Sequence, residues 1–99
     1  MIVHIALYKF KSLVCEKDIQ NTLQKVKNIK DKCSGIMDIF AGNNYHKESK
    51  NLTHGIVVLA QDQESLDNYR AHPLHKKITY FIESIEDDGL GFDFKDIEK

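Results

Sequence analysis

The sequence predicts an α+β fold whose elements follow in the order β–α–β–β–α–β. Residues 2–11 and 53–60 alternate in the manner of strands, yet both of their faces are apolar. Two other segments carry apolar residues at spacings of three and four, which is typical of helices with one buried face. The length of 99 residues suits a small core, so residues 1–99 are expected to form a single domain.

The first predicted strand spans residues 2–11. A strand that is apolar on both faces lies in the middle of a sheet and is covered on both sides. We expect helices to cover the face that contains the histidine. That face carries Ile2, His4, Ala6, Tyr8 and Phe10, and the other carries Val3, Ile5 and Leu7.

A helix over residues 16–33 is predicted next. Its apolar stripe has helical spacing, lysines fall on the opposite side, and Ser34 and Gly35 supply a left-handed C-terminal cap. Residues 36–42 then form a second strand, and the polar residues 43–52 form a loop. The stripe consists of Ile19, Leu23, Val26, Ile29 and Cys33, and the strand alternates Ile36, Asp38 and Phe40 against Met37, Ile39 and Ala41.

Residues 53–60 form the third predicted strand, again apolar on both faces. Asp62 can cap a short helix that presents Leu66 and Tyr69 inward. The strand places His54, Ile56 and Val58 on one face and Gly55, Val57 and Leu59 on the other.

Pro73 suits the first turn of a further helix, so the second helical region is expected to break at this residue. A last strand follows, bracketed by two glycines. The helix has the stripe Leu74, Ile78, Phe81, Ile82 and Ile85, and the strand has Gly89 and Gly91 around an apolar side of Leu90, Phe92 and Phe94.

This order is that of a ferredoxin-like fold, in which the first and third strands are central and the second and fourth lie at the edges. The doubly apolar strands are the first and third, and the edge strands carry Asp38 and Asp93. Helices can cover only one face of such a sheet, so the other face needs a second subunit. We therefore predict a homodimer with an interface formed by Val3, Ile5, Leu7, Val57 and Leu59.

The composition argues against several classes of partner. Lys and Arg number 14 and Asp and Glu 15, so the net charge of −1 recruits neither nucleic acid nor an anionic membrane. No segment approaches the ~20 apolar residues of a membrane span. Cys15 and Cys33 lack CxxC spacing and are interpreted as reduced thiols. We expect a cytoplasmic protein.

Four segments together resemble the stress-responsive A/B barrel (Dabb) family. They are HIALYKFK in the first strand, GIMDIFAGNN in the second, THGIVVLA in the third and NYRAHPLHKKI after it. The resemblance covers nearly the whole chain and implies a dimeric α+β barrel, in which two four-stranded sheets face each other with the helices outside. Most members have no assigned reaction, and several are plant stress proteins.

The resemblance also implies a site. One relative, olivetolic acid cyclase, closes a linear polyketide by aldol condensation and uses a tyrosine and histidines in a cavity between sheet and helices. The matching positions here are His4, Tyr69 and His75, with His75 as the principal catalytic histidine. No cofactor or metal is implied. The residues expected to line the cavity are Ala6, Tyr8, Leu23, Val26, Ile56, Ile78 and Ile82.

The chain departs from that cyclase in the lining of the cavity. Positions of the first helix that are aromatic in the cyclase are Thr22, Leu23 and Val26 here, and the chain contains no tryptophan. The catalytic pattern is therefore retained while the surface that would recognise a polyketide differs.

The residues themselves allow structural as well as chemical interpretations. His4 can be a core histidine hydrogen-bonded to Tyr69 or to a backbone carbonyl. His75 flanks the stripe of the last helix, where an imidazole with a pKa near ~6.5 can act as a general base beside the Tyr69 hydroxyl. His72 is assigned to the helix junction or the dimer rim. Because Pro73 separates His72 from His75 and no further ligand stands near them, no metal site is predicted.

Two functions follow from these interpretations. The first is a stress-associated homodimer that binds a small hydrophobic ligand, or is merely stable, with structural histidines. The second is a cofactor-free lyase or cyclase that uses His75 as base and Tyr69 as its partner. An apolar cavity that reaches His75 from solvent would distinguish the two.

Overall fold

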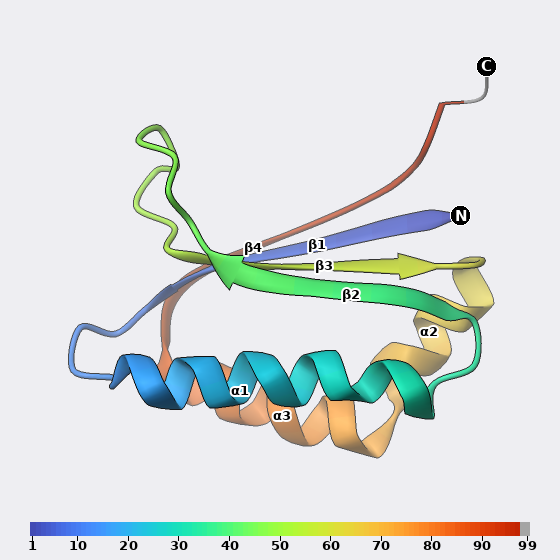
Figure 1. The fold of residues 1–99 in the computed structure, drawn as a ribbon, viewed down its shortest axis with the longest axis horizontal. Coiled ribbons are helices and arrows are strands. Elements are labelled where there is room, and N and C mark those ends of the chain that lie inside the picture. The colour runs from blue at the N-terminus through green and yellow to red at the C-terminus, as the bar shows by residue number, and fades with distance from the viewer. Residues whose placement is uncertain (98–99) are drawn as a thin grey trace.

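The structure, a computed structural model, describes residues 1–97 and consists of one sheet with helices on one of its faces (Figure 1). Residues 98 and 99 of the predicted domain lie outside the described part. The elements are β1 (Ile2–Phe10), α1 (Glu16–Asn28), a 3-10 turn η1 (Ile29–Lys32), β2 (Ile36–Asn43), β3 (His54–Ala60), α2 (Gln63–Ala71), α3 (Pro73–Ile85) and β4 (Glu86–Lys95).

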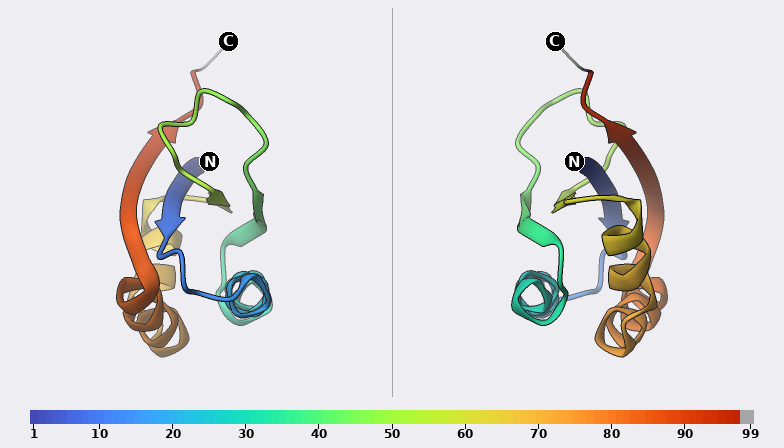
Figure 2. Two further views of the ribbon diagram at one scale, coloured as in Figure 1. Left: turned by 90° about the vertical axis from the view of Figure 1, so that its left-hand side faces the viewer. Right: turned by 90° about the vertical axis from the view of Figure 1, so that its right-hand side faces the viewer.

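All strand pairs are antiparallel, and the strand order is β2-β3-β1-β4. The two strands predicted to be central, β1 and β3, are therefore central, and the ferredoxin-like α+β prediction is confirmed. Seen end-on, α1 and α3 run side by side beneath the curved sheet (Figure 2). In the described part of the chain, the opposite face of the sheet carries no helix, so these residues form two layers.

The hydrophobic core fills the space between the sheet and the helices. On β1, the residues buried in the core belong to the face that contains His4, which was predicted to be the one covered by helices. Val58, Ala60 and Leu66 are completely buried. Burial of apolar side chains on this scale is the main term that stabilises a small domain. The core consists of Ile2, Ala6, Phe10, Ile19, Leu23, Val26, Ile29, Ile36, Ile39, Ile56, Val58, Ala60, Leu66, Tyr69 and Ile82.

The opposite face of the sheet, which we call the outer face, is apolar and uncovered in the single chain. Register pairs Val3 with Phe94, Ile5 with Phe92 and Leu7 with Leu90 across β1 and β4. The predicted interface residues Val3, Ile5, Leu7, Val57 and Leu59 are half-buried. The neighbouring large side chains Phe40, Leu90, Phe92 and Phe94 are 52%, 56%, 60% and 40% exposed.

Local caps explain why the helices begin where they do. The Asp62 carboxylate accepts a hydrogen bond from the Ser65 backbone N–H at 2.8 Å, so it caps α2 as predicted. The second helical region breaks at Pro73, as expected, and His72 Nδ1 accepts from the Leu74 N–H at 3.1 Å. Gly35 has φ +82°, and a Cβ there would meet the Ser65 hydroxyl, so glycine is required.

Three boundaries differ from the prediction. The α-helix ends at Asn28, and Ile29–Lys32 tighten into a 3-10 turn, so the helix is shorter than residues 16–33. A bulge between Ile36 and Asp38 turns Ile36 into the core instead of leaving it on the face of Asp38 and Phe40. The last strand starts at Glu86, directly after α3, rather than at the glycines.

Candidate functional site

The rings of Tyr69 and His75 are in contact beneath the sheet. Their centroids lie 4.5 Å apart with an interplanar angle of 54°. Tyr69 stands near the end of α2 and is 2% exposed, whereas His75 stands in the first turns of α3 and is half-buried. The break at Pro73 positions the two side chains, because it turns the chain between the helices that carry them.

The hydrogen bonds of His75 define which ring nitrogen is basic. Nδ1 lies 3.2 Å from the Arg70 carbonyl oxygen, which can only accept, so Nδ1 carries the proton. Nε2 then has the lone pair, with the Thr79 hydroxyl 3.5 Å away. Burial lowers the pKa of His75, the hydrogen bond to the Arg70 carbonyl opposes this, and the electrostatic effects of His4, Arg70 and His72 lower the pKa further. The imidazole is therefore neutral at pH 7.

The hydroxyl of Tyr69 is the acid of this pair. Burial raises the pKa of Tyr69, and the nearby Tyr8 adds to the effect. The hydroxyl consequently stays protonated at every physiological pH and is available as a hydrogen-bond donor. A neutral base beside a protonated phenol is an arrangement that general acid–base chemistry uses.

His4 belongs to an ion-pair group that adjoins the same region. Its Nδ1 lies 2.5 Å from Asp93 Oδ1 on β4, and Arg70 Nη2 lies 2.5 Å from Asp93 Oδ2. Arg70 Nη2 also lies 3.1 Å from His4 Nδ1, but a guanidinium can only donate, and a protonated Nδ1 cannot accept from it. The shorter contact, with a carboxylate that accepts, indicates that Nδ1 carries a proton and donates it to Asp93. Partial burial raises the pKa of Asp93, and the bonds from Arg70 and His4 outweigh it, so the net shift is downward.

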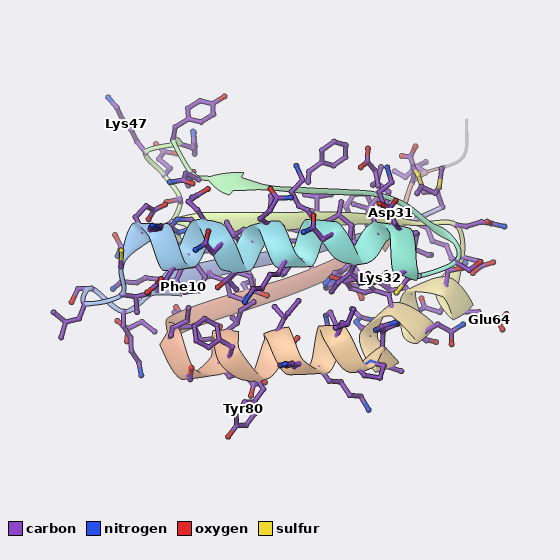
Figure 3. The ribbon with its side chains drawn as sticks, turned by 60° about the horizontal axis from the view of Figure 1, so that its bottom comes forward. Phe10, Asp31, Lys32, Lys47, Glu64 and Tyr80 are labelled. Atoms are coloured by element: carbon purple, nitrogen blue, oxygen red, sulfur yellow. The ribbon has the colours of Figure 1, made fainter. Side chains whose placement is uncertain are left out.

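A cleft of 460 Å³ opens between α1 and α3. Its floor is apolar and its rim carries lysines, and Figure 3 looks toward the side on which these two helices lie. The lining residues are Thr22, Lys25, Asn28, Ile29, Lys32, Leu74, Lys77, Ile78 and Phe81.

The structure distributes the predicted cavity residues over two places. Ile78 lines the α1–α3 cleft. Ala6, Leu23, Val26, Ile56 and Ile82 are buried in the core, and Tyr8 packs against it. The lining of the cleft does not include His4, Tyr69 or His75, which lie nearer to the sheet. A common cavity for the three residues remains a prediction.

The remaining histidines have structural contacts. His54 is 6% exposed, its Nδ1 lies 2.7 Å from the Thr53 hydroxyl, and its Nε2 lies 3.1 Å from Glu16 Oε1. It thus joins β3 to the start of α1. The hydrogen bond from His54 leads the interactions that lower the pKa of Glu16. His72 caps α3, which places it at the helix junction.

The sequence analysis missed the partners of His4 and the lysines of the cleft. Asp93 is 89 positions from His4, and only the register of β1 against β4 brings them together. Lys25 was placed on the side of the first helix away from the apolar stripe. Lys25 has no acidic residue three or four positions away on its helix, so it cannot form an intrahelical ion pair. This was the sequence signal that could have indicated another role for Lys25.

The fold and these contacts define a class of protein. It is a small ferredoxin-like α+β protein with an uncovered apolar sheet face and a histidine–tyrosine pair under the sheet. The chain belongs to the Stress responsive A/B Barrel Domain (Dabb) family, which matches residues 2–96. The resemblance seen in the four sequence segments is thereby confirmed.

Solved structures with the same fold include proteins of several kinds. A protein of Arabidopsis thaliana has a TM-score of 0.89 at 21% identity, over 100% of this chain and 98% of that chain. The hydroxynitrile lyase of Passiflora edulis has a TM-score of 0.89 at 13% identity, over 99% and 94%. A dimeric ferredoxin-like protein of unknown function from Thermobifida fusca has a TM-score of 0.81 at 17% identity, over 94% and 88%. At these identities the likeness shows the fold.

No sequence among curated proteins matches the chain significantly. Within residues 1–97, none of the helices has the length and apolar character that crossing a membrane requires. The same part of the chain contains no group of three or more His, Cys, Asp or Glu side chains placed to hold a metal ion.

Proposed function

We propose that the protein is a cytoplasmic, stress-associated homodimer that binds a small apolar ligand. The dimer is supported by the outer face, because four large apolar side chains there are 40% to 60% exposed in the single chain. Obligate interfaces of this kind commonly bury upward of about 2,000 Å². The solved structures of the same fold include proteins that are dimeric.

The observation that supports ligand binding is the α1–α3 cleft. Its volume of 460 Å³ falls within the range of about 300–1,000 Å³ that is usual for small-molecule sites. Its floor of Ile29, Leu74, Ile78 and Phe81 is apolar. The cleft lies in the helical layer, on the side of the molecule away from the outer face, so a dimer formed through the sheets leaves it open.

Binding of N-phenyl-1-naphthylamine, a neutral apolar fluorophore, tests this proposal. The fluorescence of the probe should rise on mixing with the protein, and Phe81→Ser should weaken the binding because it removes part of the floor. Tyr80→Ser is the matched control: Tyr80 is the adjacent aromatic residue of α3, is 79% exposed and points away from the helix (Figure 3). Equal loss in both variants, or no binding by the wild type, would contradict the proposal.

A second function, a cofactor-free lyase or cyclase, is favoured by the Tyr69–His75 contact. The proton on Nδ1 leaves Nε2 of His75 as a base, and the protonated Tyr69 hydroxyl can polarise a carbonyl or cyanohydrin oxygen. One protein of the same fold, the Passiflora edulis enzyme, is a hydroxynitrile lyase. This function requires that a substrate reach His75, which is half-buried in the single chain.

Mandelonitrile cleavage, followed by the absorbance of benzaldehyde, is the corresponding assay. If His75 is a base, His75→Asn should abolish turnover while the melting temperature changes little. If its role is structural, the same substitution should lower the melting temperature and no turnover should be seen in the wild type.

A further inference from the structure

The charged groups on the rim of the α1–α3 cleft are of one sign. Its ionisable side chains are Lys25, Lys32 and Lys77, and none of the residues 1–97 that line it carries a carboxylate. Asn28 adds an amide whose oxygen already accepts a hydrogen bond from Gln24 at 2.9 Å. The Thr22 hydroxyl donates to the Asp18 carbonyl oxygen at 2.8 Å. The charged groups that the described lining offers to a ligand are therefore three lysine ammonium groups, which can only donate.

These lysines have no anionic partner of their own. Among residues 1–97, the structure forms one lysine–carboxylate ion pair, between Lys30 and Asp38 at 3.5 Å, and it lies outside the cleft. Neither Lys25 nor Lys77 has an acidic residue three or four positions away on its helix, where an intrahelical pair would form. Within residues 1–97, no carboxylate therefore forms an ion pair with Lys25, Lys32 or Lys77.

The helix dipole does not account for Lys77 as it does for Lys25. Lys77 is the fifth residue of α3, beyond the first turn in which the dipole acts most strongly, and that first turn contains no acidic residue. Lys25 lies in the last turn of α1, where a cation is favourable without any ligand. Lys25 and Lys77 thus bring positive charge to the cleft from two different helices.

We propose that the ligand of the cleft is a carboxylate with an apolar body, such as a medium-chain fatty acid. The apolar part would lie on Ile29, Ile78 and Phe81, and the carboxylate would lie at the rim between Lys25 and Lys77. This inference rests on the proposed ligand-binding function and adds the chemical class of the ligand. A lysine ammonium acts as a point charge, and no arginine is among the described residues that line the cleft, which suits a single carboxylate.

Displacement of N-phenyl-1-naphthylamine by dodecanoate and by 1-dodecanol tests the inference. Both share the apolar chain, so the ratio of their affinities isolates the charge. We expect dodecanoate to bind about tenfold more tightly than 1-dodecanol at low salt, from two to three exposed ion pairs. The advantage should shrink at an ionic strength of about 1 M, where charges more than ~3 Å apart are screened.

Variants identify the lysines responsible. Lys77→Gln and Lys25→Gln should each weaken dodecanoate binding about threefold, the usual effect of an exposed ion pair, and leave 1-dodecanol unaffected. Lys47→Gln, in the loop between β2 and β3 (Figure 3), is the control and should change neither ligand. If 1-dodecanol binds as tightly as dodecanoate, the inference is wrong and the ligand-binding proposal stands. If neither ligand displaces the probe, the ligand-binding proposal itself is wrong.

Discussion

Phe92→Ala tests the proposed dimer through one side chain of the outer face. Phe92 lies on β4 opposite Ile5 and is 60% exposed in the single chain. A phenylalanine side chain has about 200 Å² of surface, so ~120 Å² remains to be covered by a partner. At about 25 cal/mol per Å² this area is worth ~3 kcal/mol in each subunit. A twofold dimer counts it twice, so we expect the dissociation constant to rise by about four powers of ten.

Sedimentation velocity across a concentration series measures this change. The wild type should sediment as a dimer at micromolar concentration and the Phe92→Ala variant largely as a monomer, with its circular dichroism spectrum retained. The control is Tyr80→Ala, since Tyr80 is 79% exposed but lies on α3 in the helical layer. A wild type that is a stable monomer, or a Phe92→Ala dimer of unchanged affinity, would refute the reasoning.

Three further substitutions test other parts of the structure. Ile5→Asp places a charge in the middle of the outer face and should abolish folding and dimerisation together; a folded dimer by circular dichroism and sedimentation would show that this face is not an interface. Pro73→Ala should change the free energy of unfolding in urea by no more than about 1 kcal/mol, because proline at the first helical position forgoes no hydrogen bond; a loss of several kcal/mol would mean that it fixes another contact. His75→Gln should reduce the loss of folding stability that the wild type shows as the pH falls below neutrality. Because burial holds the folded pKa of His75 below its ordinary value, the unfolded chain binds the proton first and wild-type stability falls as the pH drops below ~6.5. If the melting temperatures of the wild type and of His75→Gln fall equally between neutral and acid pH, this prediction is wrong.

The sequence was sufficient for the sheet because side-chain alternation reports directly on burial. The double apolar faces of residues 2–11 and 53–60 identified the central strands, and Pro73 identified the break between the last helices. The bulge at Ile36–Asp38 was not predictable from alternation, because it depends on how β2 pairs with β3. The early end of α1 is likewise a choice between α and 3-10 hydrogen bonds that helical spacing does not distinguish.

The candidate site was predictable only in part. Tyr69 and His75 lie on adjoining inward stripes, so their proximity followed from helical geometry and the turn at Pro73. The contact of His4 with Asp93 and Arg70 depends on strand register and on the packing of α2, which no local pattern encodes. The cleft arises between two helices, so periodicity within each helix assigned Lys25 to solvent without indicating that Lys77 lies across from it.

Isoleucine δ1-methyl NMR spectra recorded during a titration with 1-dodecanol test the central claim, that the cleft between α1 and α3 binds a small apolar ligand. Ile29 and Ile78 line the cleft, whereas Ile5 lies on the outer face of the sheet. The methyl resonances of Ile29 and Ile78 should shift together and saturate with one affinity, and that of Ile5 should stay in place. Resonances of Ile29 and Ile78 that do not move, or a shift confined to Ile5, would contradict the account.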